Sequence, residues 1–239
     1  MKKIVALFDI HVPDHINLNP VFEFIKDWKP THIVIGGDAH SYPSVSAWDS
    51  DQSRNLDGGT IKQNHEELNK IVLEPVRKAS SKAQIIYLEG NHEYRLVRAC
   101  ASIPNLRNYA ELKLNIPKDI KLYPMNIPYR ANENLVYVHG IYINKYHARA
   151  TVEAYHTSVI YGHVHSFQSH TTVSPVDYSH FYKGQSIGSL SHLNPDWMKN
   201  RPNAWVNGFS YTYVENGSFW DTPVVIVKNT FWALGRRYK

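Results

Sequence analysis

The sequence of 239 residues contains only one cysteine, Cys100. A lone cysteine builds neither an internal disulfide framework nor a cysteine-based zinc site, so a reducing cytoplasm is the expected location. No apolar run approaches the roughly 20 residues that cross a bilayer. The apolar run at residues 4–8 stops at Asp9 and is shorter than the roughly 7 to 15 residues of a secretory signal. We therefore predict a protein that has no membrane segment.

A strong excess of one charge is also missing, because the formal net charge is only +5. This modest positive charge is compatible with an acidic substrate or nucleic acid and does not require either. Internal repeats, linkers and low-complexity tracts are absent from the sequence as well. The length is sufficient for one substantial core, so we predict a single domain over residues 1–239.

Hydrophobic patterning changes character along the chain. The first half alternates strands with helices, at residues 4–8, 20–28, 32–35, 60–79, 84–88 and 94–101. Residues 102–134 contain four prolines and are expected to be irregular, with short strands or turns, and residues 41–59 are expected to be a long loop. The second half has one predicted helix, at 146–155, and is otherwise rich in strands, at 135–138, 158–161, 185–187, 209–214, 224–227 and 230–233. This pattern predicts an α/β fold of two packed mixed sheets flanked by helices.

Potential metal ligands follow five of the predicted strands. They are Asp9 with His11, Asp38, Asn91 beside His92, His139, and His163 with His165. Strand ends that share one edge of a sheet can bring such side chains together. An interval of two residues in an extended chain also places both side chains on one face. The pattern therefore predicts one site at a common rim.

The number and type of donors indicate two metal ions. With His92 set aside, the donors are two carboxylates, one amide and four imidazoles, which exceed the needs of one tetrahedral ion. Two divalent cations roughly 3.5 to 4 Å apart could share Asp38 and act on a phosphate together. Mixed His, Asp and Asn ligation suits Mn, Fe, Zn, Co or Ni better than Ca or Mg. We expect Mn, with the other four as alternatives.

These motifs, taken in order, resemble those of a known superfamily. Asp9-x-His11, Gly37-Asp38, Gly90-Asn91-His92-Glu93, His139-Gly140 and Gly162-His163-x-His165 look like the five motifs of the calcineurin-like metallophosphoesterases. The resemblance covers residues 9–165 and implies their fold, a double β-sandwich flanked by helices (αββα).

The resemblance also implies a role for each motif residue. The first metal would be held by Asp9, His11, Asp38 and His165, and the second by Asp38, Asn91, His139 and His163. A metal-bridging hydroxide would attack phosphorus in line, and His92 would protonate the leaving group or orient the phosphate. Many relatives have an aspartate that orients this histidine at the position of Ser41, so the partner of His92 is left open.

Members with Gly-His-x-His are often phosphodiesterases, so the resemblance favours a phosphodiester substrate, cleaved by a nuclease or a nucleotide phosphodiesterase. A phosphomonoesterase acting on a phosphoprotein or small metabolite is the alternative, and a non-catalytic metal-binding scaffold is the less favoured one. The sequence lacks the long carboxyl-terminal extension with which relatives acting on DNA ends recruit partner subunits. We therefore expect no obligate protein partner.

Further candidates lie beside the motifs. Arg95 could bind substrate phosphate from the start of the helix after Asn91, although a solvated helix face would explain it equally well. His40 could contact substrate, against the simpler reading of an exposed loop histidine. The aromatic tail could stack nucleobases, but we favour packing in a sandwich for its rings. These rings are Trp197, Trp205, Phe209, Tyr211, Tyr213, Phe219, Trp220, Phe231 and Trp232.

Overall fold

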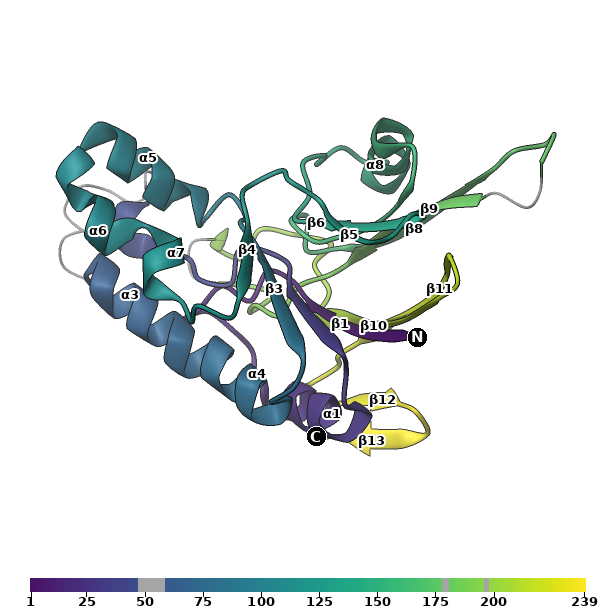
Figure 1. The fold of residues 1–239 in the computed structure, drawn as a ribbon, viewed down its shortest axis with the longest axis horizontal. Helices are drawn as coiled ribbons and strands as arrows, with labels where there is room; N and C mark the ends of the chain where they lie inside the picture. Colours follow the sequence, from purple (N-terminus) through teal and green to yellow (C-terminus); the bar gives the residue numbers. More distant parts are fainter. Residues whose placement is uncertain (47–58, 178–180, 196–197) are drawn as a thin grey trace.

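The computed structural model describes residues 1–46, 59–177, 181–195 and 198–239, and it contains two large mixed β-sheets (Figure 1). The first sheet has the strand order β11-β10-β1-β2-β3-β4. Its strands are β1 (Lys2–Leu7), β2 (His32–Ile35), β3 (Gln84–Leu88), β4 (Lys121–Tyr123), β10 (Gly208–Glu215) and β11 (Ser218–Val225). Strands β1 to β4 run parallel, and β10 joins β1 in the antiparallel sense.

The second sheet has the strand order β5-β6-β7-β9-β8. Its strands are β5 (Tyr129–Asn132), β6 (Leu135–Val138), β7 (Ser158–Tyr161), β8 (Phe167–Val173) and β9 (Phe181–Ile187). Strands β6, β7 and β9 are parallel, so their carboxyl ends share one edge. A separate hairpin pairs β12 (Phe231–Ala233) with β13 (Arg236–Tyr238).

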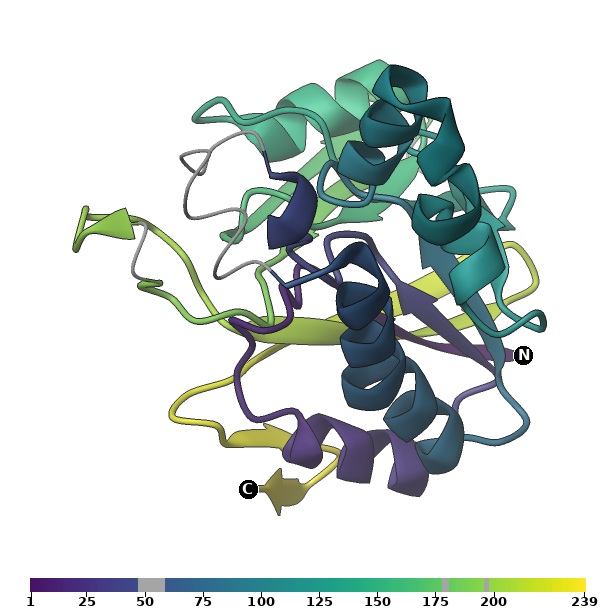
Figure 2. The same ribbon diagram turned by 90° about the vertical axis from the view of Figure 1, so that its left-hand side faces the viewer.

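Helices cover the outer faces of both sheets (Figures 1 and 2). Helix α8 (His147–Tyr155) packs on the second sheet, and α1 (Asn19–Trp28), α3 (Ile61–Leu68) and α4 (Glu74–Ala79) lie against the first. Helices α5 (Tyr94–Ser102), α6 (Arg107–Ala110) and α7 (Leu112–Asn115) gather near one end of α3. Two sheets flanked by helices confirm the predicted fold class. No helix in the described ranges is long and apolar enough to cross a membrane.

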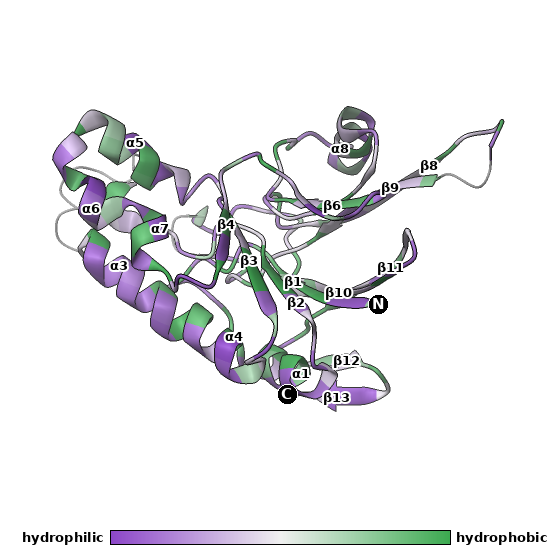
Figure 3. Ribbon diagram, in the orientation of Figure 1, coloured by the Kyte–Doolittle hydropathy of each residue, from purple (hydrophilic) through white to green (hydrophobic). Residues whose placement is uncertain are grey.

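The side-chain alternation of β1 shows how the layers are held together. Ile4 and Ala6, together with Phe8 just after β1, are fully buried in the core between the two sheets, whereas Val5 and Leu7 belong to the core under the helices. Buried strands of this kind carry apolar residues on both faces, as parallel sheets between layers require. Figure 3 shows the same concentration of hydrophobic residues along the central strands. Packing on both faces fixes where each strand ends.

The predicted helix at 60–79 is two helices joined by a π-helical turn. Thr60 and Gln63 form a capping box that begins α3. The π turn at Asn69–Leu73 then precedes α4, which has Pro75 in its first turn. Proline lacks an amide hydrogen and clashes with the carbonyl of the preceding turn, and the wider π turn accommodates both effects.

Several predicted boundaries were wrong. Residues 102–134 contain α6 and α7, which the sequence analysis did not predict. The strand expected at 224–227 is the longer β11, which begins after a turn at Asn216 and Gly217, both with positive φ. Part of the expected loop at 41–59 and Trp197 lie outside the described residues.

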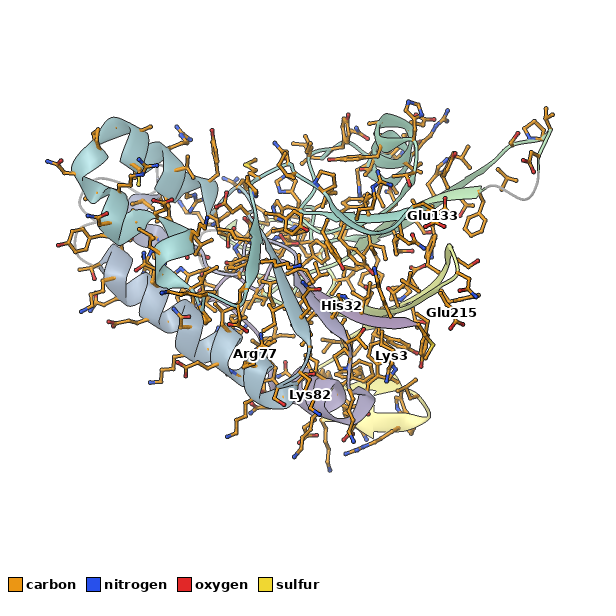
Figure 4. All side chains as sticks on the ribbon, in the orientation of Figure 1. Lys3, His32, Arg77, Lys82, Glu133 and Glu215 are labelled. Carbon is orange, nitrogen blue, oxygen red and sulfur yellow. The ribbon has the colours of Figure 1, made fainter. Side chains whose placement is uncertain are left out.

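At the edge where strands of the first sheet begin, Figure 4 shows Lys3 and His32.

Candidate metal centre

Five of the seven predicted ligands have a left-handed backbone conformation. The φ angles are 51° for Asp9, 56° for His11, 49° for Asp38, 68° for His163 and 59° for His165. Residues other than glycine seldom adopt positive φ, and each case costs about 1 kcal/mol or more unless the surrounding structure imposes it. These turns therefore hold the side chains in directions that local preference does not supply, which is typical of a functional site.

Asp9, His11 and His165 form the first cluster, with donors from the ends of β1 and β7. The Nε2 atoms of His11 and His165 are 3.1 Å apart, and Asp9 Oδ1 lies 3.4 Å from His165 Nε2 and 4.0 Å from His11 Nε2. Asp9 Oδ1 is buried and accepts no hydrogen bond from the described residues. A buried carboxylate oxygen is costly without a positive partner, so this arrangement fits a cation.

The second cluster surrounds Asp38. Its Oδ2 atom lies 3.4 Å from His139 Nε2 and 3.8 Å from His11 Nε2. One ligand atom each from Asp38, His139 and His163 fit within 4.8 Å of one another, and Asn91 Oδ1 lies 3.0 Å from His139 Nε2. Asp38 therefore stands between the two clusters, in the position that the sequence analysis assigned to the shared ligand.

Hydrogen bonds orient these ligands. His139 Nδ1 donates to the carbonyl of Gly36 at 3.0 Å, which leaves Nε2 facing the cluster. The Oδ2 atom of Asp9 accepts from the amide of His163 at 2.7 Å, and Asp38 Oδ1 accepts from the amide of His92 at 2.8 Å. In each carboxylate one oxygen is tied to the neighbouring loop, and the other is directed at the imidazoles.

The electrostatics of the pair Asp38 and His139 favour opposite charges. Burial acts to raise the pKa of Asp38, but the nearby imidazoles of His139 and His92 hold it well below its usual range. Burial acts to lower the pKa of His139, but the Asp38 carboxylate outweighs it and raises that pKa to about 10. The carboxylate therefore attracts positive charge, and a metal ion would take the place of the imidazolium proton.

Two motif glycines allow the loops to approach the carboxylates. A Cβ atom at Gly90 would lie 2.2 Å from Asp38 Oδ1, and one at Gly162 would lie 2.2 Å from Asp9 Oδ2. Neither separation is possible between real atoms. The glycines are therefore required by close contact with the candidate ligands.

Residues from later in the chain brace the Asp9 turn. The amide of Leu190 lies 3.2 Å from the carbonyl oxygen of Phe8 and 3.0 Å from that of Asp9, and the amide of Val206 donates to the carbonyl of His165 at 2.8 Å. The strained ligand turns are thus held by segments that follow β9 and precede β10.

The orienting partner of His92, which the sequence left open, is a backbone carbonyl. His92 Nδ1 donates to the carbonyl oxygen of Ser41 at 3.0 Å. Arg95 Nη1 donates to the same oxygen at 2.8 Å, and Arg95 Nη2 lies 3.3 Å from His92 Nε2. Ser41 therefore orients His92 through its main-chain carbonyl and not through its side chain. No sequence pattern could have revealed this contact, since every residue carries a carbonyl.

Glu93 is a residue of the site that the sequence analysis quoted but gave no role. It is 1% exposed, and its carboxylate accepts four hydrogen bonds. Oε2 accepts from the amides of Asp38 at 2.8 Å and Gly90 at 2.9 Å, and Oε1 accepts from the amide of Ala39 and the hydroxyl of Tyr87. Burial, reinforced by Asp38, raises the pKa of Glu93 to about 7. Glu93 fastens the Asp38 loop to the loop that carries Asn91.

The two candidate substrate contacts differ in their placement. Arg95 lies at the cluster, beside His92. His40 is fully buried, with Nε2 3.0 Å from Glu67 Oε2 and Nδ1 accepting from the amide of Tyr42. Burial lowers the pKa of His40 to about 4. The expectation of an exposed loop histidine was wrong, and a substrate could reach His40 only if these bonds broke.

The fold and the cluster together define a protein with the metallophosphoesterase fold and a candidate centre of Asp and His ligands. A Vps29 double mutant from Entamoeba histolytica is similar over 98% of this chain and 97% of its own, with 10% identity and a TM-score of 0.50. Vps29 from Chaetomium thermophilum follows at 12% identity, with 95% of this chain and 93% of its own covered and a TM-score of 0.49.

A third structure, wild-type Vps29 from Entamoeba histolytica complexed with Zn²⁺, covers 98% of this chain and 97% of its own at 11% identity, with a TM-score of 0.49. No protein-family model matches the chain, and no curated protein matches it in sequence. At such low identity the likeness to Vps29 concerns the fold alone.

Proposed function

We propose that this protein is a metal-dependent phosphoesterase that hydrolyses a phosphodiester. The observation that carries the proposal is the convergence of the seven predicted ligands from the ends of both sheets, with Asp38 between two clusters. Asp9, His11, Asp38 and His165 would hold one divalent cation, and Asp38, Asn91, His139 and His163 the other. Mn is our first choice, with Fe, Zn, Co or Ni as alternatives.

The residues of the chain would divide the work on the substrate. Bound divalent cations would polarise the phosphate oxygens and make water a stronger nucleophile. His92, held through Nδ1 by the carbonyl of Ser41, presents Nε2 to the cluster; as the imidazolium, with a second proton on Nε2, it would orient the phosphate or protonate the leaving group. A phosphate oxygen would compete for the N–H of Arg95 that now faces His92 Nε2.

A diester is favoured over a monoester because the Gly-His-x-His motif that supplies His163 and His165 resembles that of the phosphodiesterases in the superfamily. A phosphomonoesterase is the alternative, and the single guanidinium of Arg95 at the cluster is the feature that would serve it. A metal-binding scaffold is the other alternative, in which the same cluster would hold an ion without hydrolysing an ester. The pairing of ligands with an oriented His92 favours catalysis over binding alone. We also propose that the protein needs no obligate protein partner.

The test compares bis(p-nitrophenyl) phosphate with p-nitrophenyl phosphate in the presence of Mn²⁺. Asp38→Asn keeps the shape of the shared ligand and removes its charge, and Asp119→Asn makes the same change at a surface ion pair with Arg77. We expect Asp38→Asn to lose more than the roughly 10- to 100-fold that loss of a ligand-orienting group costs, and Asp119→Asn to keep full activity.

Each result separates the candidates. Preference for the diester supports the proposal, and preference for the monoester supports the phosphatase. Full activity in Asp38→Asn would contradict metal catalysis at this centre. Stoichiometric metal binding without hydrolysis of either ester would favour the scaffold.

A further inference from the structure

The turn that contains Asp9 is held in part by one main-chain amide, that of Leu190. This amide lies 3.2 Å from the carbonyl oxygen of Phe8 and 3.0 Å from that of Asp9. The two carbonyls flank the α-carbon of Asp9, so a three-centre hydrogen bond to both restrains the torsions between them. Asp9 has a φ angle of 51°, which a residue other than glycine keeps only when its surroundings impose it. Leu190 therefore helps to keep a candidate metal ligand in its direction.

The side chain of Asn207 fixes the loop that carries Leu190. Its Nδ2 atom donates to the carbonyl of Ser191 at 2.6 Å and to that of Ser189 at 3.3 Å, the two residues on either side of Leu190. Asn207 is only 9% exposed, and all three loop residues are buried with it. A carbonyl oxygen only accepts hydrogen bonds, so the NH₂ group is the end of the amide that must face this loop. These two bonds set where the amide of Leu190 lies relative to Asp9.

The backbone around Asn207 also reaches a second ligand of the first cluster. The amide of the preceding residue, Val206, donates to the carbonyl of His165 at 2.8 Å, and His165 likewise has a positive φ, of 59°. The amide of Ser189 donates in turn to the carbonyl of Val206 at 3.0 Å, and Ser189 and Asn207 form an isolated β-bridge. Asn207 therefore stands between the support of Asp9 and the support of His165.

We propose that Asn207 is a positioning residue for the first candidate metal site, the one formed by Asp9, His11, Asp38 and His165. The inference rests on the proposed function, which divides the ligands between two ions. Asn207 acts through the main chain of Leu190 and Val206 and does not contact the ion itself. It lies beyond the five motifs, which end at His165, so the resemblance assigns it no role.

The second candidate site has supports of its own. His139 is oriented by the bond from its Nδ1 to the carbonyl of Gly36, and Glu93 fastens the loop that carries Asn91. Within the described ranges, Nδ2 of Asn207 bonds to neither of these loops. Loss of the Asn207 amide should therefore weaken one metal site and spare the other.

The experiment is a calorimetric titration of the metal-free protein with Mn²⁺. Two reference variants assign the binding steps, since His11→Ala removes a ligand of the first site and Asn91→Ala removes a ligand of the second. We expect Asn207→Ala to weaken the step that His11→Ala weakens by about tenfold, the lower end of the range for groups that orient a metal ligand. The step that Asn91→Ala weakens should keep its wild-type affinity.

Asn69→Ala is the matched control, because Asn69 Nδ2 also donates to two main-chain carbonyls, those of His65 and Asn115, each at 2.8 Å. Asn69 lies in the π turn and outside the ligand clusters. Its loss should reduce stability in urea without weakening either binding step. Asn207→Ser retains one hydroxyl donor and should weaken the first step by a smaller factor, so it decides the question if Asn207→Ala does not fold.

Three results would overturn the inference. The first is an unchanged affinity of the first step in the variants of Asn207. The second is equal weakening of both steps, or equal weakening by Asn69→Ala, since the Asn207 amide would then only support the fold. The third is a wild type that binds fewer than two ions.

The two proposals can fail separately. Selective weakening of the first step by Asn207→Ala, in a protein that hydrolyses no ester, leaves the role of Asn207 standing and removes the phosphodiesterase. Ester hydrolysis by a protein whose two binding steps do not depend on Asn207 leaves the proposed function standing and removes the positioning role.

Discussion

The ion pair between Lys183 and Asp221 links the two sheets, and its removal should destabilise the protein strongly. Lys183 Nζ on β9 lies 3.0 Å from both carboxylate oxygens of Asp221 on β11. The side chain of Asp221 is only 4% exposed and that of Lys183 is 22% exposed. Lys183→Met keeps the aliphatic stem and leaves a buried carboxylate without its partner. Loss of one partner of a buried pair costs about 3 to 5 kcal/mol, and the partial exposure of Lys183 places this case near 3 kcal/mol.

Urea unfolding at pH 7 with a fixed Mn²⁺ concentration measures this cost. The control is Arg149→Met, which breaks the pair with Glu153 on the surface of α8, where both side chains are more than half exposed. That change should alter the free energy of unfolding far less, because solvent screens exposed pairs. The double variant of Lys183→Met with Asp221→Asn has no unpaired charge and should recover at least half of the loss. The reasoning is refuted if Lys183→Met costs no more than Arg149→Met, or if the double variant is as unstable as the single one.

Three further predictions concern the centre and its surroundings. Gly90→Ala should displace Asp38 and reduce the affinity for metal, measured by titration calorimetry, at least tenfold. The control Gly235→Ala, whose Cβ meets nothing within 4 Å, should keep the wild-type affinity. Equal affinities of the two variants would contradict the close-contact argument. Burial lowers the pKa of His65 to about 4 in the folded protein. As the pH falls from about 6.5 to 4, the His65 imidazole is therefore protonated in the unfolded chain but not in the folded protein. The wild type should lose up to about 3 kcal/mol more stability than His65→Gln over that window, and parallel urea curves for the two proteins would refute this. Removal of metal with a chelator should lower the free energy of unfolding by about 2.7 kcal/mol, compared with the protein at a metal concentration of 100 times Kd. The free energy of Asp38→Asn should change less. A wild type whose stability does not change with the chelator would argue against a bound ion.

The sequence was most informative where a strand ends. Buried strands such as β1 and β3 read as apolar runs, and the polar residues directly after them had to lie at one edge of the sheet. Hence the positions of Asp9, Asp38 and His139 could be predicted from chain order alone, and the structure brings them together.

Contacts between distant segments could not be predicted in the same way. His40 is fully buried, and its Nε2 lies 3.0 Å from Glu67, on a helix 27 residues later. The carbonyl of Ser41 binds His92 because the backbone passes close to the imidazole at this point, and the amino-acid composition does not predict that path. In the region of four prolines, Pro104 occupies the first turn of a 3₁₀ helix, where its missing amide hydrogen has no cost. Helices α6 and α7 were therefore hidden by prolines that do not interrupt them.

One missed element was readable. Asn216 and Gly217 form the tight turn between β10 and β11, with φ angles of 48° and 77°. An Asn-Gly pair between apolar runs is a strong indicator of a two-residue hairpin, because both residues tolerate positive φ. Recognition of this pair would have placed the start of β11 correctly.

The braces on the Asp9 turn have a consequence for synthesis on the ribosome. All seven candidate ligands have been translated once His165 is made. The residues that hold the ligand turns, Leu190 and Val206, are translated later, and so is β10, which pairs with β1. The emerging chain therefore carries a complete set of metal donors before it can hold them in their left-handed conformations. A fragment of residues 1–170 should bind a divalent ion weakly, and tight binding should require a chain that extends through β10. Metal capture would thus mark the completion of folding.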